Sequence, residues 1–290
     1  MRPTRALRSL LMLAPLVLPY QAARAQRYWH DEQGRDAFRL DLGKPFLKGD
    51  GHSFFTGTAV PSMSLRAADG IRVEADFPLM RAGFEFGGTI GDQSSVRVGN
   101  PYVGLRVGED AKLISGTLGF RLPLAAKPDT PIGQQALTAG ALTTFDEFEA
   151  FAANFLTVRG ALEAHKVSAN HILLGAKAGP SVLITTNGNP NAQTDVFFDF
   201  GGRVGYEGSG SQLSVGLSGR YLVTPADKAF LFCSNVNVNC EVKRAHYAAT
   251  GAAELRWGSI RPRVTIRIPF NKDTRNQVGA ILGLGVSVAR

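Results

Sequence analysis

The sequence lacks any apolar run of membrane-helix length after its first 25 residues. A helix that crosses a bilayer needs about 18 or more apolar residues in succession. This absence excludes a helical inner-membrane protein. The chain also has no Lys/Arg block and no interleaving of basic with aromatic residues, which argues against a nucleic-acid-binding surface.

Catalytic signatures are absent as well. We find no G-x-S-x-G elbow, no H-E-x-x-H pair, no Walker loop and no dinucleotide-binding fingerprint. His165 with Ser168, or His246, would suit a lipid hydrolase built on a barrel, but a histidine in the lumen or at the rim is the simpler interpretation. We therefore expect no enzyme, no cofactor and no metal site.

The first 25 residues predict a signal peptide. Three arginines precede an apolar stretch from Leu10 to Tyr20, which Pro15 and Pro19 interrupt, and Ala23-Arg24-Ala25 forms a small-residue cleavage site. The mature chain should begin at Gln26. Removal of four arginines and no acids lowers the formal net charge from +8 to +4, so much of the high charge belongs to the targeting segment. The alternative is an uncleaved anchor helix.

From about residue 36 onward, apolar residues alternate with polar or small ones, which is typical of strands with two different faces. In 276–289, the apolar residues from Val278 to Val288 share one face, and glycine, serine and glutamine share the other. In 259–270 the same apolar face opposes Arg261, Arg263 and Arg267. The apolar face suits lipid and the other face suits water.

The predicted strands are 36–46, 53–66, 71–86, 96–107, 111–124, 155–167, 171–186, 194–206, 211–224, 244–256, 259–270 and 277–289. Short and long connections alternate between them, as in outer-membrane barrels. We predict an all-β, transmembrane, antiparallel up-and-down barrel of about twelve strands over 36–290, preceded by a periplasmic segment at 26–35. Ten or fourteen strands are the alternatives. Outer-membrane lipids and the barrel assembly machinery are the expected partners, and the oligomeric state is left open.

The predicted lumen-facing positions carry ten cations and five acids. Facing lipid, such charges would cost about 2–4 kcal/mol at the bilayer midplane. The pore-lining candidates are Arg72, Glu74, Asp76, Arg121, Arg159, Glu163, Lys177, Asp199, Arg203, Arg220, Glu254, Arg256, Arg261, Arg263 and Arg267. The cationic excess predicts a mildly anion-preferring channel for small polar or amphipathic solutes. The alternative is a structural barrel closed by salt bridges, with loops that bind a partner.

The segment 125–154 carries the one helical signal. Thr144 with Glu147 forms a capping box, and Phe145, Phe148, Ala152 and Phe155 follow helical spacing, which predicts a short helix in a long external loop. The constriction-loop candidates are Phe145, Asp146, Glu147, Phe148 and Glu149. Folded inward, the acids would oppose the arginines. As alternatives, the helix caps the barrel from outside, or its phenylalanines form an apolar entrance.

Two stretches, Val98-Gly99-Asn100-Pro101-Tyr102-Val103-Gly104-Leu105 and Gly116-Thr117-Leu118-Gly119-Phe120-Arg121-Leu122-Pro123, resemble the outer-membrane transporter family associated with meta-pathway phenol degradation. The likeness extends loosely over most of the mature chain. It implies uptake of small compounds, aromatic ones among them, and supplies no binding residues. Unlike many barrel proteins, the sequence finishes without an aromatic residue, on Val288-Ala289-Arg290.

Cysteine is scarce: Cys233 and Cys240 lie seven positions apart in one polar stretch, and His246 alone does not complete a metal site. In a chain that crosses an oxidising periplasm, this pair predicts a local loop disulfide. The peptide that holds both cysteines should resist alkylation until a reductant is added, as read by mass spectrometry. Alkylation of either thiol without reductant would contradict the assignment.

Overall fold

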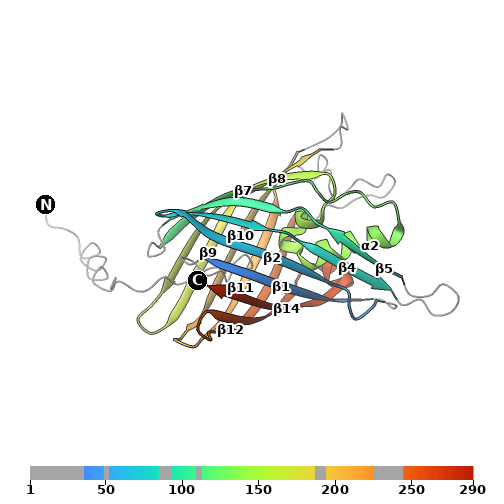
Figure 1. Cartoon of the computed structure of the whole chain (residues 1–290). Coiled ribbons are helices and arrows are strands. Elements are labelled where there is room, and N and C mark those ends of the chain that lie inside the picture. Colours follow the sequence, from blue (N-terminus) through green and yellow to red (C-terminus); the bar gives the residue numbers. More distant parts are fainter. Residues whose placement is uncertain are drawn as a thin grey trace.

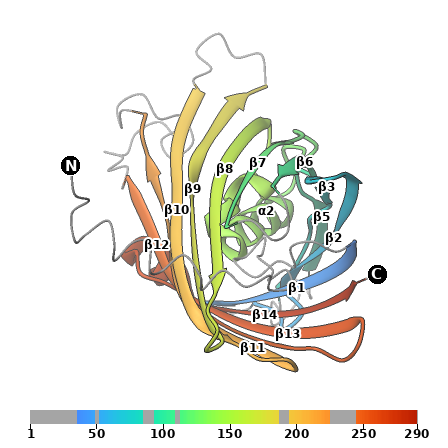
Figure 2. The same ribbon diagram turned by 90° about the vertical axis from the view of Figure 1, so that its left-hand side faces the viewer.

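The computed structural model describes residues 36–48, 52–84, 93–108, 113–186, 194–224 and 244–289. Residues 1–35, with the predicted signal peptide and N-terminal segment, lie outside this description, as do Cys233 and Cys240. The strands form one antiparallel sheet that closes on itself, because β1 pairs both with β2 and with β14. Figures 1 and 2 show the resulting barrel.

The strands are Ala37–Leu47 (β1), Gly57–Ala68 (β2), Ile71–Asp76 (β3), Leu79–Phe84 (β4), Gln93–Val98 (β5), Tyr102–Val107 (β6), Ile114–Arg121 (β7), Phe155–Val167 (β8), Ile172–Thr185 (β9), Thr194–Glu207 (β10), Ser211–Leu222 (β11), Ala245–Leu255 (β12), Ile260–Pro269 (β13) and Val278–Ala289 (β14). The helical segments are Pro131–Thr143 (α2), the 3₁₀ segment Phe145–Phe151 (η2) and Lys272–Gln277 (α3). None of the helices in the described ranges is both long and apolar enough to cross a membrane.

The fourteen strands occupy twelve positions around the barrel. Each position is called a stave below, whether one strand or two successive strands fill it. β3 and β4 are one interrupted stave, because both pair with β2 on either side of Phe77 and Pro78. Likewise β5 and β6 pair with β4 and β3 and are separated by Gly99, Asn100 and Pro101. The predicted all-β antiparallel barrel of twelve strands, with a short helix in a long loop, is confirmed. The interruptions match prolines, which cannot donate a ladder hydrogen bond.

The pattern of burial is the reverse of that in a soluble protein. On β6, Arg106 is 5% exposed, whereas its neighbours Leu105 and Val107 are 48% and 57% exposed. On β13, Arg261 is buried and Val264 is exposed. Charged side chains therefore point into the barrel and apolar side chains point outward, which is the arrangement of a barrel that faces lipid.

The predicted helix position was wrong. The α-helix begins earlier, at Pro131, where the Thr130 hydroxyl accepts a hydrogen bond from the Gly133 amide at 3.2 Å. Thr144 lies at the end of α2 and donates its hydroxyl to the Gly140 carbonyl instead of capping a new helix. Glu147 leaves helical geometry at φ −139°, so the following segment is only a broken 3₁₀ turn. Phe155 is the first residue of β8.

The lumen contains a close packing of tyrosine on glycine. An added Cβ at Gly119 would lie 2.5 Å from Cζ of Tyr102, whereas at Gly116, on the same strand, the nearest atom would be 3.7 Å away. We expect Gly119→Val to destabilise the barrel by about 1–3 kcal/mol through overpacking. Gly116→Val should leave stability nearly unchanged. Urea unfolding in detergent micelles checks this, and equal loss in both variants would contradict the packing argument.

Candidate functional site

The long connection between β7 and β8, residues 122–154, folds into the barrel and is called the plug below. Figure 2 shows its helix α2 within the ring of strands. Two acids of the plug, Glu147 and Glu149, are buried and bind arginines of the wall. The sequence left the inward and outward arrangements open, and the structure has the inward one.

Glu147 lies between two arginines from neighbouring strands. Its carboxylate oxygens pair with Arg121 at the end of β7 and with Arg159 on β8. Arg121 also donates to Asp76 at 3.1 Å. The strand pairing places Arg121 opposite Thr157, so the two arginines lie close together on the wall and one carboxylate of the plug can bridge them.

Glu149 completes the same network from the other side. It accepts hydrogen bonds from both terminal nitrogens of Arg220, at 2.6 and 3.1 Å. Arg220 also pairs with Asp199 at 2.5 Å, and Asp199 in turn lies 3.3 Å from Nε of Arg159. A continuous chain of charges therefore joins β3, β7, β8, β10 and β11 to the plug.

The remaining constriction-loop candidates also contact the wall. Asp146 accepts a hydrogen bond from Arg267 at 2.5 Å, and Arg267 donates a second one to the Thr143 carbonyl at 2.6 Å. The guanidinium of Arg267 lies 5.4 Å from the Phe145 ring. That of Arg220 lies 4.9 Å from the Phe148 ring. All five predicted loop residues are thus brought to the arginines.

Asn100, in the interruption between β5 and β6, holds the backbone of the plug. Its side-chain amide donates to the carbonyls of Glu149 at 2.8 Å and Ala152 at 2.7 Å, and its Oδ1 accepts from the Ala125 amide at 2.7 Å. Asn100 is fully buried. A Cβ at the preceding Gly99 would overlap the Ala150 carbonyl, so only glycine permits this close approach. The Gly-Asn-Pro-Tyr stretch is therefore the attachment point of the plug.

A second group of charges lies farther from the plug. Glu163 pairs with Arg106 at 2.7 Å and with Lys177 at 3.1 Å, and Arg106 also reaches Glu74 at 3.0 Å. At the barrel end away from the plug, Arg256 pairs with Glu207 at 2.8 Å and lies 3.8 Å from Glu254. Arg72 pairs with Asp36 at 3.2 Å. These pairs hold most of the remaining predicted pore-lining residues.

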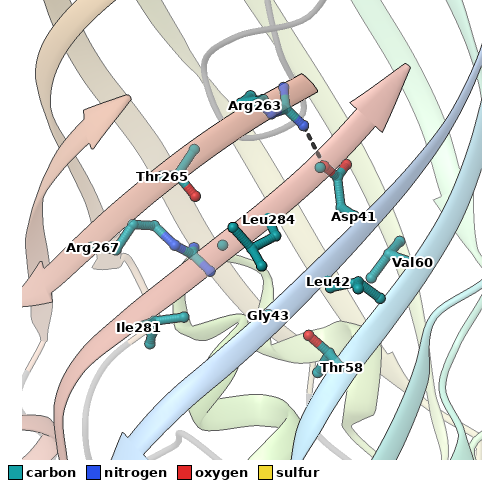
Figure 3. Close-up of a pocket in the computed structure, with 12 residues that line it drawn as sticks. Asp41, Leu42, Gly43, Thr58, Val60, Arg263, Thr265, Arg267, Ile281 and Leu284 are labelled. Carbon is teal, nitrogen blue, oxygen red and sulfur yellow. Dashed lines mark hydrogen bonds and ion pairs between the residues drawn. The ribbon is translucent and has the colours of Figure 1, made fainter. Parts of the chain in front are cut away.

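The arginines of β13 share a small space with residues of the next strands along the wall, β14, β1 and β2. Figure 3 shows Arg263 paired with Asp41, and Arg267 next to Thr265 on the same strand, with Gly43 on β1 on the other side of β14. The space between these side chains is about 20 Å³. A water molecule needs roughly 10–15 Å³ by this measure, so the space accommodates about one water.

Sequence reasoning missed several charges of the lumen. Arg106 shares the inward parity of Tyr102 and Gly104, and Asp41 lies between outward Leu40 and Leu42, so alternation alone was sufficient to find both. Alternation could not show whether the plug acids Asp146, Glu147 and Glu149 point into the lumen, because they do not lie on a strand. With these carboxylates included, the cationic excess counted from the strands is largely compensated.

The histidines considered for a hydrolase do not form a catalytic pair. Nδ1 of His165 accepts a hydrogen bond from Arg203 at 2.9 Å, and within the described part of the chain Nε2 of His165 has no hydrogen-bond partner. The Ser168 hydroxyl accepts a hydrogen bond from the Ile172 amide in the β8–β9 turn. His246 lies beside α2 and Thr274 in a largely apolar cavity. Among the described residues, we find no cluster of three or more potential metal ligands.

Comparison with solved structures identifies the fold. An outer membrane channel from Pseudomonas putida F1 is similar, with a TM-score of 0.57, 10% identity and coverage of 88% of this chain and 96% of the channel. The translocator domain of the autotransporter NalP from Neisseria meningitidis has a TM-score of 0.50, 8% identity and coverage of 88% of each chain. No family model matches the chain. No curated protein matches it either. The chain thus has the fold of outer-membrane β-barrels.

Asn100→Ala should loosen the plug, because three hydrogen bonds to its backbone are lost and buried carbonyls are left unsatisfied. Glutamyl endopeptidase should then cleave after Glu147 or Glu149 at least about tenfold faster, which corresponds to 1.4 kcal/mol of opening free energy. Ser168→Ala is the control, because Ser168 also bonds a backbone amide, that of Ile172, but in the β8–β9 turn at the end of β8 opposite to the plug. Equal cleavage of both variants would contradict the anchoring role.

Proposed function

We propose that this protein is a narrow channel of the bacterial outer membrane for small polar or amphipathic solutes, with the plug as its constriction. The observation that carries the proposal is the insertion of the plug and its attachment to lumen arginines through Asp146, Glu147 and Glu149. A barrel that needed only a rigid interior would be served by pairs between strands. Here, a segment outside the barrel wall supplies the partners.

The path we propose follows the wall formed by β13, β14, β1 and β2. Arg263, Thr265 and Arg267 of β13 line it, together with Gly43 of β1 and Thr58 of β2. In the described conformation the space there accommodates about one water, so a larger solute requires the plug to shift. Such a shift separates buried ion pairs, and losing one partner of a buried pair costs about 3–5 kcal/mol. Plug withdrawal should therefore be infrequent without a solute.

Withdrawal of the plug changes the charge of the lumen as well as its width. Three carboxylates leave, while Arg121, Arg159, Arg220 and Arg267 remain on the wall. Positive charge in a low-dielectric channel lowers the energy of an anion. The channel should therefore prefer anions, and most strongly in its open state. Aromatic solutes, which the family resemblance implies, are a further prediction of this proposal.

The alternative is a structural barrel whose lumen is sealed by salt bridges. The paired state of the lumen charges is compatible with this alternative. A sealed barrel of this kind would insert into the membrane but pass no current.

We expect instead that the purified full-length mature chain in a planar bilayer carries current, with a reversal potential in a salt gradient on the anion-selective side. Arg263→Glu should shift this potential toward cations. Arg66→Glu, which alters an exposed pair with Asp69, is the control.

Glu149→Gln should open the channel more often. It keeps the side-chain shape but removes the negative charge that Arg220 pairs with, so the inserted state loses stability relative to the open one. We expect openings to become at least about tenfold more frequent, equivalent to 1.4 kcal/mol. Glu207→Gln, which alters a pair with Arg256 at the other end of the barrel, should leave the opening frequency unchanged. Unaltered gating in Glu149→Gln would show that the plug does not control conduction.

A further inference from the structure

A cavity of about 360 Å³ lies between the plug and the barrel wall. It differs from the charged constriction in its chemistry. Four phenyl rings line it, from Phe145, Phe148, Phe151 and Phe155, with Leu137, Ala141 and Leu142 of α2 beside them. Its volume falls within the range of about 300–1,000 Å³ that is usual for small-molecule sites.

The polar groups of the cavity are few. They come from Gln134 and Thr138 on α2, His246 on β12 and Thr274 on α3. Among the residues that the structure describes, the lining includes no Asp, Glu, Lys or Arg. Arg220 and Arg267 contact the rings of Phe148 and Phe145 without lining the cavity. The site therefore suits an apolar molecule with one hydrogen-bonding group and does not suit an ion.

The rings of the cavity are held in place by the surrounding structure. Phe148 packs edge-on against Phe197 at a centroid distance of 5.6 Å, and Phe151 packs on Gly140, where a Cβ would meet its ring at 2.6 Å. Phe151 and Phe155 are buried. Aromatic walls fixed in this way favour a flat ring, which gains from edge-to-face and offset contacts.

Two separate bodies form the cavity. The plug contributes the residues from Gln134 to Ala153, whereas Phe155, His246 and Thr274 belong to β8, β12 and α3 of the barrel. A molecule bound here contacts both at once. Since a ligand stabilises the conformation that it binds, occupancy favours the inserted plug over the withdrawn one.

We propose that this cavity is a binding site for an uncharged compound of one or two fused rings with a single hydrogen-bonding group, and that the bound compound holds the plug in the closed position. The effect on current rests on the proposed channel function, but binding does not. The compound acts here as a closing ligand, and it is distinct from any solute that passes along the arginine wall.

The first test is binding of 1-naphthol to the full-length mature chain in detergent micelles, by isothermal titration calorimetry with protein-free micelles as the blank. We expect saturable binding of one equivalent. Thr138→Trp places a large side chain at the cavity and should weaken binding at least about tenfold, equivalent to 1.4 kcal/mol. Gln135→Trp is the matched control, because Gln135 is exposed on α2 and does not line the cavity.

Absence of saturable binding, or equal weakening in both variants, would overturn the site. Naphthalene-1-sulfonate has the same rings with a full negative charge, and equal affinity for it would overturn the assignment to an uncharged compound. In the planar bilayer, 1-naphthol should lower the current of the wild type and of Gln135→Trp but not of Thr138→Trp. Binding without any fall in current would refute closure by the ligand. A silent wild-type barrel would count against the channel, and the calorimetric result would still decide the site.

Discussion

The pairing of buried charges is the interaction on which this structure depends. The outer surface is largely apolar, and most of the charged side chains of the strands are directed into the interior. There, an unpaired charge loses the hydration that it had in water, and the cost is several kcal/mol even after relaxation. The barrel can therefore close only if cations and carboxylates meet. Arg121, Arg159 and Arg220 meet this condition through Glu147 and Glu149, which the barrel wall does not provide.

The plug is consequently part of the folded barrel and not an appendage to it. Its acids complete the arginine network, and its backbone is fixed by Asn100 in an interruption of the wall. The interruption between β5 and β6 looks like a defect of a strand. It also lets the wall turn its own backbone toward the plug, with the Asn100 amide donating to the Ala150 carbonyl at 2.6 Å. A continuous ladder would have used those groups between strands.

The alternation of residues was enough to predict the barrel, the twelve staves and the inward direction of most charges, because a period of two assigns each side chain to a face. It could not predict which charges pair. Arg263 and Asp41 are 222 positions apart, and Arg267 and Asp146 are 121 apart, so their contact depends on barrel closure and on the path of a loop. The helix was misplaced for a local reason. The Thr144 side chain bonds back to Gly140, while Pro131 and the Thr130 cap favour an earlier start.

The plug presents two kinds of chemistry to the barrel wall. Its carboxylates point to arginines, and the phenylalanines at neighbouring positions line a separate apolar cavity. Phe145 and Phe148 belong to both environments, because each ring contacts a guanidinium and also lines the cavity. A guanidinium held by a carboxylate and covered by a phenyl ring is shielded from the cavity. The same rings therefore keep the ionic network dry and make an apolar site beside it, so displacement of the plug must disturb both together.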